Sequence, residues 1–110
     1  MSFLARVAPP SDAGLLPYPF AYVITYELKG PPILYQDLFT YLQASDGWCH
    51  WVRDTWLVVR RETLVVLANQ LRQKIKAGDW LMVMPAKGPI DGWLPPEAWD
   101  WINKHVPREW

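Results

Sequence analysis

The spacing of hydrophobic and polar positions along this chain changes several times, and each change marks a predicted element. Residues 21–28 (AYVITYEL) are rich in β-branched and aromatic side chains, which is typical of a strand. Residues 33–44 instead repeat apolar side chains at helical spacing, which predicts an amphipathic helix. The side chains on its apolar face are Leu34, Leu38, Tyr41 and Leu42.

Two short β runs in the middle of the chain predict an antiparallel hairpin. They are residues 48–52 and residues 55–60, and they flank an Arg-Asp pair. This pair suits a two-residue turn poorly, so a loop of two or of four residues stays open. With either loop, we expect Trp51 to lie opposite Trp56 on one face of the sheet.

The second half of the chain continues the succession of helices and strands. Residues 64–76 predict a helix, with Thr63 as its N-cap and Gly78 as the glycine that follows its C-terminus. Its apolar stripe consists of Leu64, Leu67, Ala68, Leu71 and Ile75. The elements that follow are a strand at 80–84, a loop at 86–94 and a helix at 95–106, which two prolines open.

This order of elements predicts an α+β domain, a ferredoxin-like βαββαβ sandwich with an additional C-terminal helix. Two helices would lie on one face of a four-stranded antiparallel sheet, and the other face would need a cover. A second copy of the chain, the C-terminal helix or the N-terminal segment could each supply it. We interpret residues 1–20, which hold four prolines, as an extended arm and residues 21–110 as a single domain.

Composition narrows the function classes. Eleven basic and eleven acidic residues cancel, so the chain as a whole exerts no electrostatic attraction on nucleic acid or on an anionic membrane. A single cysteine, Cys49, excludes an internal disulfide framework and suits a reducing cytoplasm. The N-terminus lacks the apolar core of a signal peptide, and no apolar run could span a bilayer. We therefore expect a cytoplasmic protein without a membrane partner.

Several short motifs, in order, resemble those of a known family. They are AYVITYELKGP, then Tyr35, then GWCHWVRDTWLVV, a helix with Leu71, AGDWLMVM and a tail that bears tryptophans. Together they resemble the SinR-like branch of a group of small ferredoxin-like proteins, over about residues 21–102. That group is similar to the small CRISPR-associated adaptation subunit and to virulence-associated protein D.

The resemblance implies a homodimer whose interface includes strand 4 or the C-terminal segment. In some relatives it also implies a divalent-metal ribonuclease or deoxyribonuclease. Their key acid is an aspartate at the end of strand 1, paired with its symmetry mate, and the matching residue here is Glu27. Two such carboxylates could hold one Mg²⁺ between two subunits. The alternative, which we favour, is that Glu27 is a solvated charge paired with Lys29 or with an arginine.

Other chemistry-bearing residues also have two interpretations. His50 would be a general base or a phosphate ligand, or a partly buried histidine bonded to the backbone or to a tyrosine, which we favour. Arg53, Arg60 and Arg61 would line a nucleic-acid groove or belong to a solvated surface of mixed charge, which we favour. His105 suits the C-terminal end of the last helix dipole.

Tryptophans crowd the C-terminal segment. We expect the last helix either to pack on the core or to bring Trp93 or Trp101 against a second subunit. Three functions stay open: a non-catalytic homodimeric interaction module, a magnesium-dependent nuclease and a nucleic-acid binder without catalysis. In the nuclease, Glu27 would come from each of two subunits, and Arg60 or Arg61 would hold the phosphate. No pattern indicates a small-molecule cofactor.

Overall fold

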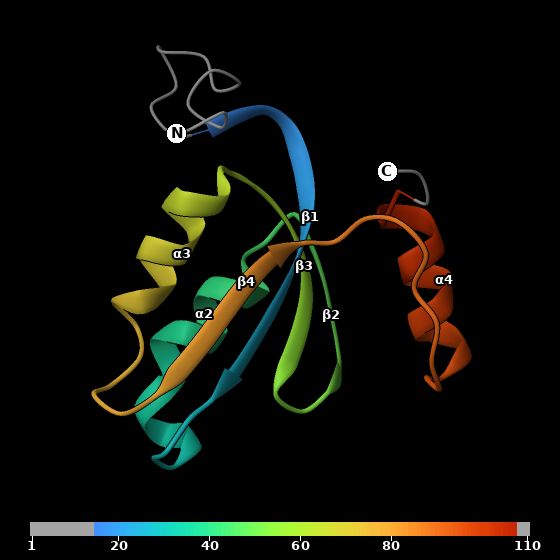
Figure 1. Ribbon diagram of the computed structural model, residues 1–110. Coiled ribbons are helices and arrows are strands. Elements are labelled where there is room, and N and C mark those ends of the chain that lie inside the picture. Colours follow the sequence, from blue (N-terminus) through green and yellow to red (C-terminus); the bar gives the residue numbers. More distant parts are fainter. Residues whose placement is uncertain (1–14, 108–110) are drawn as a thin grey trace.

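The computed structural model describes residues 15–107, which form one four-stranded sheet with helices on both of its faces (Figure 1). Neighbouring strands pair antiparallel, in the order β2-β3-β1-β4. The prediction of an α+β domain with a four-stranded antiparallel sheet is therefore confirmed. The elements are β1 (Leu15–Glu27), η2 (Pro32–Tyr35), α2 (Gln36–Gln43), β2 (Gly47–Val52), β3 (Thr55–Glu62), α3 (Leu64–Arg72), β4 (Trp80–Pro85) and α4 (Pro96–His105).

Helices α2 and α3 cover one face of the sheet, which we call the closed face. Its strand residues are Tyr22, Ile24, Tyr26, Trp56 and Val58, each at most 7% exposed. They alternate in sequence with residues that point to the opposite face, as the two-residue period of a strand requires. The helices contribute the fully buried leucines Leu38, Leu42, Leu67 and Leu71. Burying each such side chain stabilises the fold by roughly 1.5–3 kcal/mol, so this layer is the main core.

Both helices of the closed face are shorter than predicted. The first begins as a 3₁₀ turn at Pro32–Tyr35, becomes α-helical at Gln36 and ends at Gln43. The second begins as expected, with the Thr63 hydroxyl accepting a hydrogen bond from the Val66 amide. It ends at Arg72, so Gly78 is not its C-terminal glycine. Gly78 has φ +90° and lies in the turn before β4.

Helix α4 lies on the opposite side of the sheet, which we call the open face (Figure 1). It packs there through Ile102 and Val106 against Ala21 and Ala86, which are all buried. Of the three predicted covers, the C-terminal helix is therefore the one that the structure shows. It covers part of this face and leaves apolar side chains of β4 in solvent.

Strand β1 begins at Leu15, six residues earlier than predicted. Leu15 pairs with Glu62 of β3, an irregularity in the register follows, and pairing resumes at Phe20. Pro17 and Pro19 cannot donate to a ladder, which explains why the pairing is interrupted there. The second half of the predicted arm therefore belongs to the sheet, and the remainder of the arm, residues 1–14, lies outside the described residues.

The hairpin of β2 and β3 closes with a two-residue turn, because Val52 pairs directly with Thr55. The register shifts between Cys49 and Val52, so the predicted pairing of Trp51 with Trp56 is wrong. The rings that contact Trp56 are those of Trp48, His50 and Phe39, and Trp51 is 52% exposed. A shift of one residue turns side chains to the other face, which is why the hydrophobic pattern alone misplaced this tryptophan.

Candidate functional site

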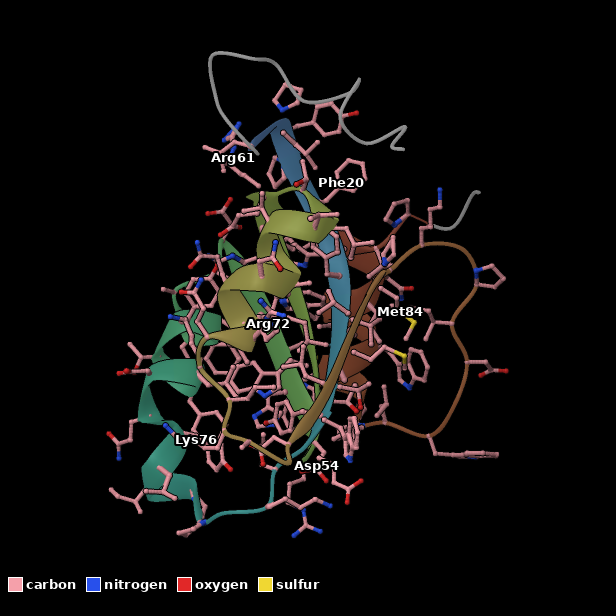
Figure 2. The ribbon with its side chains drawn as sticks, turned by 60° about the vertical axis from the view of Figure 1, so that its left-hand side comes forward. Phe20, Asp54, Arg61, Arg72, Lys76 and Met84 are labelled. Atoms are coloured by element: carbon pink, nitrogen blue, oxygen red, sulfur yellow. The ribbon has the colours of Figure 1, made fainter. Side chains whose placement is uncertain are left out.

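A row of exposed apolar side chains lies on β4. Trp80, Met82 and Met84 point to the open face and are 68%, 55% and 37% exposed, whereas Leu81 and Val83 between them pack against the main core. We call the three exposed residues the β4 face. In Figure 2, Met84 and Arg72 of α3 lie on opposite sides of β4. Because β4 is at the edge of the sheet, its outer side has no neighbouring strand within residues 15–107.

Glu27 lies at one corner of the β4 face. In the register of the sheet it is opposite Trp80, and Thr25 is opposite Met82. The carboxylate of Glu27 is exposed and accepts a hydrogen bond from the Lys29 ammonium at 2.6 Å. This is the ion pair that the sequence suggested as the structural role of Glu27. An exposed pair of this kind contributes little to stability, so Lys29 can leave it at low cost.

A buried carboxylate fixes the strand ends on which Glu27 and Trp80 lie. Asp79 accepts hydrogen bonds from the backbone amides of Lys29 at 2.8 Å and of Lys76 at 2.7 Å. Burial alone would raise the pKa of Asp79, but these amide hydrogen bonds outweigh it and lower the pKa. The ionised carboxylate thus ties the end of β1 to the turn before β4, which holds Glu27 and Trp80 side by side.

The described residues of one chain supply too few ligands for a metal ion. Within residues 15–107, no three side chains of His, Cys, Asp or Glu gather in a way that could hold a metal ion. Glu27 offers a single carboxylate, whereas Mg²⁺ requires near-octahedral oxygen coordination. A magnesium site at Glu27 therefore needs ligands from a second copy, from substrate phosphates and from water.

His50 is held by structural contacts. Its ring stacks on that of Trp56 with a centroid distance of 3.9 Å, and its Nε2 lies 2.7 Å from the carbonyl oxygen of Arg53. These contacts fix the turn of the β2–β3 hairpin. They match the interpretation of His50 as a partly buried histidine bonded to the backbone, and Glu27 points to the opposite face of the sheet.

Arg60 is engaged with an acid from its own strand. Its guanidinium donates two hydrogen bonds to the Glu62 carboxylate, at 2.9 Å and 2.7 Å, and lies 4.1 Å from the centre of the Tyr41 ring. Burial would raise the pKa of Glu62, but hydrogen bonds from Arg60 and Tyr41 lower it to about 2. The pKa of Tyr41 in the same group rises to about 12, because the Tyr41 side chain is partly buried and its hydroxyl donates to Glu62. This group joins α2 to the sheet.

The three arginines predicted for nucleic acid do not share one surface. Arg61 donates to the carbonyl oxygen of Pro17 at 2.8 Å, beside Arg60 at one end of β3. Arg53 is in the turn at the other end, next to Asp54, and Figure 2 shows Arg61 and Asp54 at opposite ends of the molecule. Arg53 and Arg60 are seven residue steps apart along an extended strand, roughly 23 Å. Glu27 lies toward the Asp54 end, so Arg60 and Arg61 do not face it in the same chain.

The two tryptophans predicted for an interface lie in different surroundings. Trp93, in the loop after β4, is 98% exposed. Trp101 is partly buried: it packs against the cluster of α4 on the open face, and its ring stacks on His105 at 4.3 Å. Cys49 is buried, and burial raises the pKa of its thiol. Trp93 is thus available to a partner, whereas much of Trp101 serves the packing of α4.

Sequence reasoning missed two features. The sequence predicts a strand at 80–84 but not the β4 face, although the order WLMVM already alternates Trp and Met with Leu and Val, which the structure shows exposed and partly buried, respectively. A cavity of about 590 Å³ beside the first part of β1 was also missed, because residues 15–20 were assigned to an arm outside the domain. No sequence motif marks this cavity, since distant segments build its walls.

Comparisons of this chain with models of protein families, with curated proteins and with solved structures found no match. None of the helices in the described part of the chain has the length and apolar character that crossing a membrane requires.

Proposed function

We propose that this protein is a non-catalytic interaction module that works as a homodimer, with the β4 face as its interface. One observation carries the proposal: Trp80, Met82 and Met84 expose their side chains next to one another on an edge strand. Exposed apolar side chains on a soluble protein are usually scattered, and a contiguous group of them is typical of an interface. Aromatic residues and methionine are also enriched in the contacts between proteins.

A second copy is the partner that needs the fewest further assumptions. A two-fold axis through the β4 face would set Trp80 and Met82 of one chain against the same residues of the other, which is how most homodimers associate. It would also protect the free edge of β4, where unpaired backbone groups invite uncontrolled strand pairing. The exposed Trp93 lies in the loop that follows β4, and the proposal adds it to the rim of the interface.

For the fold, we propose the ferredoxin-like arrangement. Read from the β4 edge, the strand order is β4-β1-β3-β2, so each strand–helix–strand unit encloses one strand of the other unit. Strand β3 lies between β1 and β2, and β1 lies between β3 and β4. Helices α2 and α3, which make these two connections, lie on the same face. These features support the βαββαβ sandwich, and the single buried cysteine supports a cytoplasmic location.

Sedimentation velocity over a range of protein concentrations tests the dimer. We expect the wild-type chain to dimerise and Met82→Lys to weaken the dimer by about thirtyfold, because it places a charge at the centre of the interface. The matched control is Ile33→Lys, since Ile33 is 67% exposed on η2, away from β4. A wild-type chain that remains monomeric overturns the proposal. Equal effects of the two variants would move the interface away from β4.

A second candidate is a divalent-metal nuclease, which the position of Glu27 favours. Glu27 lies beside Trp80, so a two-fold axis near this corner of the β4 face would bring two Glu27 carboxylates together. The paired carboxylates are the arrangement that the SinR-like resemblance implies for Mg²⁺. In this candidate the dimer is retained, and the metal is held between the subunits with water and phosphate oxygens.

Incubation of the pure protein with labelled RNA and DNA tests the nuclease. We expect cleavage that requires Mg²⁺, stops with chelator and is lost in Glu27→Gln, while Glu97→Gln keeps it, because Glu97 is exposed in the first turn of α4. Cleavage that survives Glu27→Gln would remove Glu27 from the reaction. The absence of any cleavage by a dimeric wild-type protein would leave the interaction module and discard the nuclease.

A further inference from the structure

We propose that the cavity beside the first part of β1 binds a small apolar anion, namely a medium-chain carboxylate. The cavity has a volume of about 590 Å³, within the range of ordinary small-molecule sites. It lies between the N-terminal part of β1, the start of α3, the end of β4 and the end of α4. Trp80, Met82 and Met84 are outside its lining, so the proposal does not rest on the dimer.

The frame of the cavity is held by hydrogen bonds between distant segments. Arg61 donates to the carbonyl oxygen of Pro17 at 2.8 Å, which fixes the strand segment that forms one wall. The Ala86 amide donates to the Ala21 carbonyl at 2.9 Å, and the Gly88 amide donates to the Pro107 carbonyl at 2.7 Å. These bonds connect β1, β3, the loop after β4 and the end of α4. A site that is held in this way needs little ordering when a ligand enters.

The lining is mainly apolar. Phe20, Leu64 and Pro85 contribute hydrophobic surface from three different elements. The Tyr22 hydroxyl already donates to the Glu62 carbonyl at 2.8 Å, and the Thr63 hydroxyl already caps α3. Few unbonded polar groups are left to recognise a sugar or a nucleobase, whose many donors and acceptors would be costly to bury unpaired. An aliphatic chain suits this lining.

The ionisable side chains that could select a charge here are basic. Lys87 lies at the exposed rim, and its ammonium makes no hydrogen bond or ion pair with any residue from 15 to 107. His105 is the other basic group, with its Nδ1 3.0 Å from the carbonyl oxygen of Trp101. Among residues 15–107, no aspartate or glutamate belongs to the lining. A lysine at the mouth of an apolar cavity, with no partner in the described part of the chain, complements a single carboxylate at the end of an aliphatic chain.

Titration of the full chain with three ten-carbon compounds tests this proposal by calorimetry and by amide chemical shifts in NMR spectra. The compounds are decanoate, decanol and decylammonium, which share the chain and differ in the head group. We expect decanoate to bind about tenfold more tightly than decanol, with shifts concentrated around Phe20, Leu64 and Ala86. Decylammonium should bind most weakly, because its charge has the same sign as Lys87.

A pair of lysine variants separates the contribution of charge from nonspecific hydrophobic binding. Lys87→Met should reduce the affinity for decanoate to that for decanol and leave decanol binding unchanged. Lys104→Met is the matched control, because Lys104 is exposed on α4 outside the lining, and it should change neither affinity. Equal binding of decanoate and decanol by the wild-type chain overturns the proposal. Shifts that avoid the cavity also overturn it, as do contacts in the free protein between the cavity and residues 1–14, which would make the chain itself the occupant.

Discussion

The two faces of the sheet are built from the same strands but are covered to different extents. On the closed face, two helices bury an aromatic and aliphatic layer, and Trp56 is 1% exposed. On the open face, a single helix covers the end of the sheet near Ala21, while Trp80 of β4 is 68% exposed. A tryptophan is therefore a core residue on one side and a surface residue on the other. Its position relative to the helices, and not its hydrophobicity, decides which.

The largest expected effect comes from removing a tryptophan on the closed face. We expect Trp56→Ala to lower the free energy of unfolding by about 3–5 kcal/mol, since it empties the centre of the core. It also removes the indole that donates to the Tyr26 hydroxyl at 2.9 Å. Trp80→Ala should cost under about 1 kcal/mol. Urea denaturation of both variants, at concentrations where they sediment as monomers, makes the comparison, and equal losses would contradict the assignment of the faces.

A second prediction concerns helix α4, which alone covers the open face within the described chain. Ile102 is 2% exposed in the small cluster that holds this helix. We expect Ile102→Ala to lower the free energy of unfolding by about 2–4 kcal/mol and to speed amide exchange in α4 more than in α3. Hydrogen exchange followed by NMR resolves the two helices. Uniform acceleration in both would mean that the two faces unfold as one unit.

A smaller effect should follow from acid, through the Glu62 carboxylate at the margin of the closed face. The pKa of Glu62 falls from 4.5 to about 2 on folding, because Arg60 and Tyr41 donate to the ionised form and outweigh the effect of burial. The folded state thus binds the proton less readily than the unfolded state. The stabilisation is complete above pH 4.5 and disappears as the pH falls toward 2.

We expect the contribution of Glu62 to the free energy of unfolding of the wild-type chain to fall by about 2 kcal/mol between neutral pH and the acid limit. Urea denaturation midpoints measured across this pH range follow the loss. The variant Glu62→Gln should be less stable at neutral pH and should show a correspondingly flatter profile. Glu97→Gln, which changes an exposed acid, should retain the wild-type slope. An unchanged slope in Glu62→Gln would show that other carboxylates cause the acid sensitivity.

The smallest expected effect is the loss of one helix cap. The Thr63 hydroxyl accepts from the Val66 amide at the start of α3, so Thr63→Ala should cost about 1 kcal/mol. Thr40→Ala, in the exposed part of α2, should leave stability unchanged or raise it slightly, because alanine has the higher helix propensity. Thermal denaturation can compare these two helices of the closed face. A larger loss for Thr40 would show that the cap does not limit the stability of α3.

The sequence predicted the elements well because their hydrophobic period is local information. The leucines of α2 and α3 and the alternation in β3 are enough to mark helix and strand. The start of β1 was misplaced because Pro17 and Pro19 favoured an arm, whereas pairing of Leu15 with Glu62 and a bond from Arg61 bring this segment into the sheet. Such long-range pairing leaves no periodic trace in the chain.

The candidate site was harder to predict than the fold. The interpretation of Glu27 as a partner of Lys29 agrees with the structure, since the two residues are close in sequence. Predicting the β4 face would have required the strand order. Trp80 and Met82 are exposed because β4 is an edge strand and α4, the helix on the open face, does not cover them. The grouping of Arg53 with Arg60 and Arg61 failed for a similar reason, since nearness in sequence along an extended strand becomes distance in space.

The central position of β1 has a consequence for synthesis on the ribosome. Strand β1 leaves the ribosome first, but its two neighbours are β3 and β4, and β4 ends at Pro85. One edge of β1 therefore lacks its strand partner until β4 has been synthesised. A fold that depends on contacts between its first and last strands forms slowly and late. We expect chaperones that shield extended apolar segments to bind translation intermediates of this chain before they bind the finished protein.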